Sequence, residues 1–341
     1  MIARSPQPVG TPDWQAALRA AYRDPRALLA FLGLAPADLD LDLESPFPFR
    51  VTREFAARMR PGDPNDPLLR QVLPLAAERA MVAGFVADPL AEQAEFADGP
   101  LLRKYAGRAL LVTTGACAIH CRYCFRREFP YAEAAGNARL AAALASLAAD
   151  ASVSEVLLSG GDPLSLDDAA LAALLARLHD IPHLRRLRIH TRLPVVLPAR
   201  VTPQLCHLLA HSRFAIALVL HVNHAHEVDD GVRDACRALR AAGATLLNQS
   251  VLLRGVNDDV DSLSTLSETL FAAGVLPYYV HALDAVRGAA HFDAGDARGR
   301  VLEDALRTRL PGYLVPRFVR EMPGAEAKLP LNMLALAPRD H

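Results

Sequence analysis

The sequence contains no long apolar run and no excess of charge of either sign. No eighteen consecutive residues are apolar and uncharged, and residues 1–14 (MIARSPQPVGTPDW) have no apolar segment ahead of a small-residue cleavage site. Lys and Arg number 37 against 38 Asp and Glu, for a formal charge of −1, so no global field holds nucleic acid or an anionic membrane. We therefore expect a soluble, cytoplasmic protein that acts on a small molecule.

Cysteine is scarce and unevenly placed. The chain has five cysteines, and three of them, Cys117, Cys121 and Cys124, fall within eight residues. Five thiols cannot all pair with one another, and this crowding is typical of metal or reactive chemistry rather than of a secreted disulfide framework. Cys206 and Cys236 lie within predicted helices, where we expect them to be buried small apolar side chains.

The dinucleotide-binding motif G-x-G-x-x-G is also missing after the first predicted strand, which disfavours a nucleotide cofactor of that kind. From Arg108 onward, short apolar runs alternate with segments of helical period, as in βα units around a parallel sheet. The predicted strands are 109–114, 155–159, 187–190, 215–222, 245–252 and 276–280, with helix starts at Thr202 and Asp258. These units predict an α/β fold, a partial (β/α)6 barrel, although an open doubly wound sheet also fits.

Composition divides the chain into three parts. Residues 1–100 have scattered prolines, a helical pattern at 14–34 and few β-branched residues, and we predict a helical N-terminal region. Residues 101–310 contain the barrel, and residues 311–341 form a C-terminal segment. The polar clusters of the barrel part each follow a predicted strand, and strand ends of a barrel share one rim, where ligands bind. These clusters are Cys117–Cys124, Gly160–Asp162, Thr191–Arg192, Asn223–His224 and Asp284.

The three crowded cysteines form the pattern C-x3-C-x2-C. Three thiolates at this spacing can bind three irons of a [4Fe-4S] cube and leave the fourth iron free for chemistry. A zinc site would need a fourth ligand, and His120 is available, although it is wedged between two of the thiols. The cysteine pattern, with Tyr123 just before its last cysteine, resembles the radical S-adenosylmethionine (SAM) superfamily, in which the free iron binds SAM. Ser159, Gly160, Gly161 and Asp162 are similar to that superfamily's glycine motif, which holds the methionine amine.

Longer segments resemble the lysine 2,3-aminomutases. The matching segments are CRYCFRREFPY, LSGGDPL, LRIHTRLPVVLPARVTP, NQSVLLRGVND, PYYVHALD, GAAHF, GAEAKLPL, DPNDPLLRQVLP and FVADPLAEQ, within residues 14–335. The shorter members of this family make (R)-β-lysine from L-lysine for modification of elongation factor P. About thirteen residues follow Lys328, which favours that role over the catabolic one of longer members. A non-catalytic iron–sulfur or zinc-binding regulatory protein is the alternative of another class.

The resemblance implies two cofactors besides the cluster, SAM and pyridoxal phosphate (PLP). It also implies an electron donor such as flavodoxin or ferredoxin and a functional link to an elongation factor P lysine ligase. PLP is held through a lysine, and Lys328 matches the family's PLP lysine; the chain has only one other, Lys104. Lys104 and Tyr105 match groups that lie against the PLP phosphate and ring, and Arg192 is a looser candidate for the phosphate or else forms a salt bridge.

Substrate and SAM contacts follow from the same resemblance. Arg126 matches the arginine that binds the lysine carboxylate, a task suited to a guanidinium fork. Asp284 and Glu321 match the two acids that hold the remote ammonium, although longer members have Asp at the second position. His221 and Gln249 match positions that contact SAM.

The histidines around the fourth predicted strand offer an alternative. His221, His224 and His226 form H-x2-H-x-H, which contains three imidazoles that could bind zinc. On one strand, however, His221 and His224 would point to opposite faces.

Overall fold

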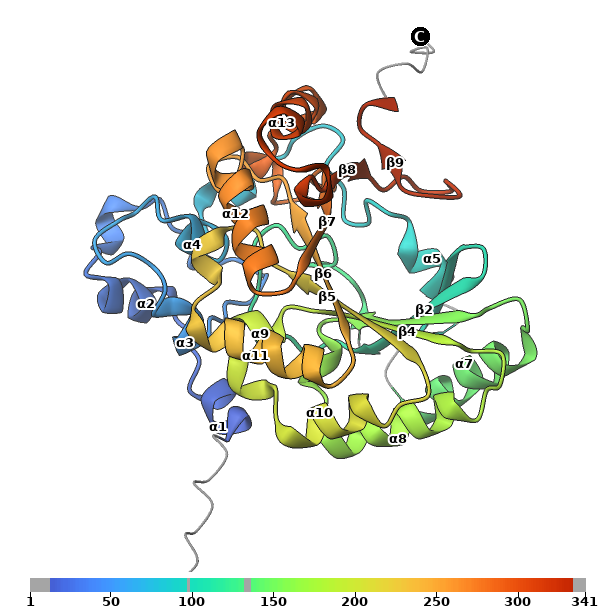
Figure 1. Ribbon diagram of the computed structural model, residues 1–341. Coiled ribbons are helices and arrows are strands. Elements are labelled where there is room, and N and C mark those ends of the chain that lie inside the picture. The colour runs from blue at the N-terminus through green and yellow to red at the C-terminus, as the bar shows by residue number, and fades with distance from the viewer. Residues whose placement is uncertain (1–12, 97–98, 132–135, 334–341) are drawn as a thin grey trace, which may run out of the picture.

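A computed structural model describes residues 13–96, 99–131 and 136–333. Its centre is one nine-stranded sheet in which the strands follow their order in the chain. The strands from β2 to β8 pair in parallel, and β1 and β9 add antiparallel strands at the two edges (Figure 1). The bounds are β1 Leu101–Tyr105, β2 Arg108–Thr114, β3 Glu155–Gly160, β4 Arg186–Thr191, β5 Ala215–His221, β6 Thr245–Val251, β7 Leu276–His281, β8 Arg317–Arg320 and β9 Leu329–Pro330.

All six predicted strands are confirmed, each with ends that differ by no more than one residue. Strands β1, β8 and β9 were not predicted. Strands β8 and β9 belong to the C-terminal segment, so the barrel sheet continues across residue 310. In the last pair Val319 faces Pro330 and Arg320 faces Leu329, and this register directs the next residues, Glu321 and Lys328, toward each other.

Amphipathic helices cover the outside of the curved sheet. They follow one another around it in chain order (Figure 1): α7 Asn137–Ala149, α8 Asp168–His179, α10 Pro203–Ala210, α11 Asp230–Ala241, α12 Val260–Ala272 and α13 Asp296–Arg309. Helix α10 starts as predicted, because the Thr202 hydroxyl accepts from the Leu205 N–H at 3.0 Å. The prediction for α12 was wrong by one residue, since its cap is Asp259 while Asp258 accepts from the Gly255 N–H.

The N-terminal region consists of short helices: α1 Trp14–Arg19, α2 Pro25–Leu32, α3 Arg53–Ala56, α4 Pro67–Arg70 and α5 Glu92–Phe96. The single helical pattern predicted at 14–34 is divided, because Asp24 and Pro25 start a new helix. Helices α2, α3 and α4 lie together beside α9 (Leu193–Val196) (Figure 1). Leu28, Phe55 and Leu68 are buried in the same hydrophobic core as the strand residues Leu111 and Leu158. The region therefore packs against the barrel as part of its core.

Among the residues that the structure describes, no helix combines the length and the apolar character that a membrane crossing requires.

Candidate active site

A cavity of about 630 Å³ extends from the carboxyl ends of the parallel strands into the barrel. All sixteen site residues expected from the sequence line it, although they are spread over residues 104–328. Phe47, Pro48, Leu90 and Glu92 of the N-terminal region complete its wall. The cavity therefore brings the expected site together in one place, as the rim of a barrel allows.

The cysteine loop follows β2 and is held from outside the barrel. Arg122 is fully buried and donates to both Glu78 oxygens, from Nε at 2.7 Å and from Nη2 at 2.6 Å. Arg50 donates to the Cys117 carbonyl at 2.9 Å. Burial raises the pKa of Cys124 to about 11 and also raises the pKa of Cys117, so these two thiols must lose protons when they bind metal.

The thiol arrangement fits a cluster better than a single ion. Within the described ranges, no three His, Cys, Asp or Glu side chains converge on the position of one metal ion. A [4Fe-4S] cube has a different requirement, because each thiolate binds its own iron. The Nδ1 atom of His120 lies 3.0 Å from the Pro48 carbonyl, so the histidine is engaged with the N-terminal region and does not complete a zinc site.

The glycine turn after β3 packs directly on the cysteine loop. A Cβ atom on Gly160 would lie 2.3 Å from the Thr114 carbonyl oxygen, and one on Gly161 would lie 2.4 Å from that of Ala116. Gly160 also has a φ of +130°, which a side chain would strain. The Gly161 N–H donates to the Thr114 carbonyl at 2.7 Å. A residue with a side chain would not fit at either position. The two glycines therefore allow the turn after β3 to pack directly against the cysteine loop.

Asp162, expected from the glycine motif to be a SAM contact, is engaged by groups of the chain itself. Its buried carboxylate accepts from the Thr191 hydroxyl at 2.7 Å and from the N–H groups of Arg192 and Leu193 at 2.8 and 3.0 Å. The Leu164 N–H is a further donor. With both oxygens engaged, Asp162 ties the end of β3 to the end of β4 and positions the turn indirectly.

Arg192 lies beside the cysteine thiols, and the phosphate contact expected of it is not supported. Its Nη2 donates to Glu227 at 2.8 Å and to Gln71 at 2.6 Å. Its Nη1 donates to the Cys121 sulfur and to the Tyr123 hydroxyl, both at 2.7 Å. Arg192 thus forms a salt bridge, and sequence alone could not identify its partner because Glu227 lies 35 residues away.

His221 and Gln249 are register partners on β5 and β6, and both line the cavity. The His221 Nε2 atom lies 2.9 Å from the Tyr123 hydroxyl. Burial, followed by the nearby Arg192, lowers the pKa of His221 to about 3, so the ring is neutral at physiological pH. His221 therefore lies next to the cysteine loop, and Gln249 lies beside it on the neighbouring strand.

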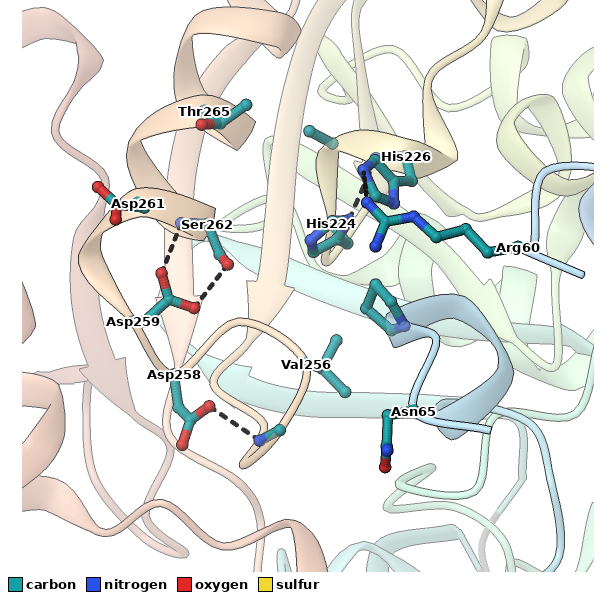
Figure 2. A pocket seen from close by; sticks show the side chains of 13 residues that line it. Arg60, Asn65, His224, His226, Val256, Asp258, Asp259, Asp261, Ser262 and Thr265 are labelled. Carbon is teal, nitrogen blue, oxygen red and sulfur yellow. Dashed lines mark hydrogen bonds between the residues drawn. The ribbon is translucent and has the colours of Figure 1, made fainter. Parts of the chain in front are cut away.

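The zinc alternative for the histidines is not supported. His224 and His226 line a separate pocket of about 460 Å³ with Arg60, Asp258 and Asp259 (Figure 2). Arg60 reaches His226, with its Nη2 atom 3.3 Å from Nε2 (Figure 2). Because His221 belongs to the inner cavity, the three imidazoles do not share one site.

A chain of ion pairs crosses the inner cavity. Arg126 Nε donates to Glu92 Oε2 at 2.6 Å, and Lys104 Nζ lies 2.6 Å from Glu92 Oε1. Lys104 Nζ also lies 3.0 Å from Glu321 Oε1, while the other oxygen of Glu321 pairs with Lys328. Burial alone would raise the pKa of Glu321, but Lys328 and Lys104 hold it well below its usual range. Three cations and two anions thus alternate across the site.

Asp284 lines the same cavity without an ion-pair partner among the described residues. Burial, followed by repulsion from Glu321, raises the pKa of Asp284 to about 7. A cation bound beside Asp284 would favour the ionised form of its carboxyl group.

Unpartnered polar atoms surround Lys328. Among the described residues, Arg108 Nε, His190 Nε2 and His281 Nε2 are buried with no hydrogen-bond partner, and all three side chains line the cavity. Buried polar groups are normally satisfied, so these atoms indicate a missing polar ligand. The Arg108 guanidinium also lies 4.8 Å from the centre of the Tyr105 ring. Burial lowers the pKa of His190 and of His281 to about 3, so Arg108 is the cation of this group and the two rings are neutral. A guanidinium with neutral polar neighbours beside a lysine fits an anionic cofactor such as PLP.

Several residues of the site were not predicted: Glu78, Glu92, Gln71, Glu227 and the three unpartnered groups. Glu78, Glu92, Gln71 and Glu227 each contact a site residue that is distant in sequence, and the other three have buried atoms without a partner. Glu92 lies in DPLAEQ, a segment whose resemblance to the family is the one signal that could have identified it.

Comparison with known proteins agrees with this geometry. Residues 111–265 match the Radical SAM superfamily. The chain is 49% identical to an L-lysine 2,3-aminomutase from Escherichia coli strain K12, over 94% of this chain and 95% of that protein. A protein of the same description from Haemophilus influenzae is 44% identical, over 93% of this chain and 94% of that protein. Another, from Clostridium subterminale, is 38% identical, over 82% of this chain and 68% of that protein.

Proposed function

The chain belongs to the L-lysine 2,3-aminomutase family of radical SAM isomerases, and from this premise we propose that it moves the α-amino group of L-lysine to C3. The Radical SAM domain implies a [4Fe-4S] cluster and SAM. We assign the cluster to Cys117, Cys121 and Cys124, and the SAM contacts to the glycine turn with His221 and Gln249. Lys328 would hold PLP, beside Tyr105 and the unpartnered Arg108.

The observation that carries the proposal is the distribution of charge in one cavity. Arg126 lies at one end of the ion-pair chain, and Glu321 lies near the other, with Asp284 close by. A guanidinium fork suits the α-carboxylate of an amino acid. Two carboxyl groups suit a remote ammonium, since they repel each other unless a cation lies between them. Lysine carries both groups, whereas glutamate would place a third acid beside the other two.

The position of Lys328 in the cavity wall supports lysine as the substrate. Its ammonium pairs with Glu321, the acid that we assign to the ammonium of the substrate. Once Lys328 is committed to PLP, Lys104 is the remaining ion-pair partner of Glu321 among the described residues. The substrate ammonium then restores the charge balance. When bound, the cluster and SAM supply the radical that removes hydrogen from C3, and PLP holds the migrating nitrogen.

The proposal extends to product and partners. We propose that the product is (R)-β-lysine for modification of elongation factor P, made with electrons from a flavodoxin or ferredoxin and passed to the ligase that modifies the factor. Support comes from similarity, since the chain is 49% identical to the Escherichia coli relative and 38% identical to the one from Clostridium subterminale. Chiral analysis of the product, followed by its use with such a ligase, tests this part separately.

The central test is anaerobic incubation of the reconstituted protein with SAM, PLP, a reductant and L-lysine. We expect β-lysine, and none from a Cys121→Ala variant. L-Glutamate in place of lysine should give no β-amino acid. Turnover of glutamate, or cleavage of SAM without any β-lysine, would show that the substrate assignment is wrong.

A further inference from the structure

We propose that Glu92 is the positioning residue that sets the orientation of Arg126 for the substrate carboxylate. The inference rests on the proposed function, because it concerns how that site recognises lysine. Glu92 comes from α5, outside the barrel, yet it is only 2% exposed and its carboxylate lies in the cavity wall.

The contact between Glu92 and Arg126 is bidentate. Arg126 Nε donates to Glu92 Oε2 at 2.6 Å, and Nη2 donates to Oε1 at 3.0 Å. Two parallel hydrogen bonds fix the plane of a guanidinium as well as its position. The remaining nitrogen, Nη1, donates to the Ser159 hydroxyl at 3.0 Å. Three of the five N–H groups are thus engaged, and the rest remain for a second carboxylate.

Glu92 is itself held from two sides. Lys104 Nζ lies 2.6 Å from Oε1 and is anchored in turn by Glu321 at 3.0 Å. Burial alone would raise the pKa of Glu92, but Arg126 and then Lys104 lower it, so the residue is a carboxylate at neutral pH. With both oxygens engaged, Glu92 has no role as a ligand for substrate, and its effect passes through Arg126.

The backbone that presents Glu92 is unusual. Ala91 has a φ of +52°, and it is the one non-glycine residue with positive φ within the described part of the chain. A non-glycine residue in this left-handed region is strained, and such strain collects at functional positions. The Asp88 carboxylate holds this turn by accepting from the N–H groups of Glu92 and Gln93 at 3.0 and 2.9 Å. The chain therefore bears strain at the point where it directs Glu92 into the cavity.

The test compares Glu92→Gln with wild type as reconstituted enzymes. Without the charge, Arg126 loses its fixed plane, so we expect the KM for L-lysine to rise roughly tenfold or more. Iron content and SAM cleavage in the absence of lysine should stay unchanged. Cadaverine, which has two amines and no carboxylate, should inhibit both enzymes equally, because Lys104 and Glu321 remain paired. A Glu92→Asp variant keeps the charge, and its KM for L-lysine should lie between those of wild type and Glu92→Gln.

Asp168→Asn is the matched control, because Asp168 pairs at 2.8 Å with buried Arg200 and neither residue lines the cavity. It should lower the melting temperature and leave the KM unchanged. An unchanged KM in Glu92→Gln, or an equal loss of affinity for lysine and cadaverine, would overturn the inference. If Glu92→Gln does not fold, Glu92→Asp decides by the same comparison. A wild-type enzyme with no lysine turnover would instead refute the proposed function, and the two failures are therefore distinct.

Discussion

Asp284 is the residue whose protonation links the cavity to pH. Burial and the nearby Glu321 raise its pKa to about 7. Below that pH the carboxyl group is neutral and attracts an ammonium weakly. Lysine binding then requires loss of a proton. We expect the KM for lysine to rise as pH falls from 8 to 6, approaching about tenfold per pH unit at the acidic end.

An Asp284→Asn variant keeps the shape and removes the charge. It should bind lysine more weakly at pH 8, at a cost on the order of 2–5 kcal/mol, and its KM should not depend on pH in this range. Cluster content, PLP absorbance and SAM cleavage without lysine serve as controls. A wild-type KM in the variant would contradict the ammonium assignment.

Lys328 allows a direct chemical test of the cofactor assignment. The chain has two lysines, so borohydride reduction of the PLP-loaded protein followed by peptide mapping has two possible sites. We expect the label on Lys328, because the unpartnered groups of the cavity surround it while Lys104 is engaged by two acids. Label on Lys104, or no label, would reject the PLP role of Lys328.

At the scale of elements, burial decided which strands could be predicted. Strands β2 to β7 each have apolar residues that pack under the covering helices, either in a run, as in β3 (EVLLSG) and β5 (AIALVLH), or in alternation, as in β4 (RLRIHT). Strand β1 (LLRKY), strand β8 (RFVR) and the two-residue β9 lack this signal. Strands β1 and β9 join the sheet as antiparallel hairpins with β2 and β8, and β8 pairs with β7 across a separating helix. Their short apolar content gave no strand signal. The site was largely predictable from family resemblance, but Glu92 and the pairing of Arg192 depend on packing between distant segments.

The glycine turn after β3 gives a prediction at this scale. In a Gly161→Ala variant the new methyl group would meet the Ala116 carbonyl at 2.4 Å, and backbone cannot move aside as a side chain can. We expect a destabilisation of about 1–3 kcal/mol, together with loss of iron and of SAM cleavage. Gly312→Ala is the control, since nothing lies within 4 Å of its Cβ position, and it should retain wild-type iron content.

For the whole molecule, the buried Glu78 joins the N-terminal region to the cysteine loop through Arg122 and Arg127. A Glu78→Gln variant leaves two buried guanidinium groups without their carboxylate, at a cost of about 3–5 kcal/mol. Thermal unfolding should show this loss, and iron retention should fall with it. Asp234→Asn removes an exposed ion pair with Arg237 and should change stability by less than about 1 kcal/mol. Equal melting temperatures for the two variants would refute this role of Glu78.

The antiparallel register of β8 and β9, rather than the sequence of the turn between them, brings Glu321 and Lys328 together. Val319 pairs with Pro330 and Arg320 with Leu329. In an antiparallel pair the next residue of one strand lies opposite the preceding residue of the other, so Glu321 lies opposite Lys328. The acid and the lysine meet because the ladder aligns them, whatever sequence connects them. Residues 322–326 therefore act as a connection whose sequence can vary, whereas Ala327 also lines the cavity. A slip of the ladder by one residue is different, because it turns each side chain to the other face and would separate the pair at once.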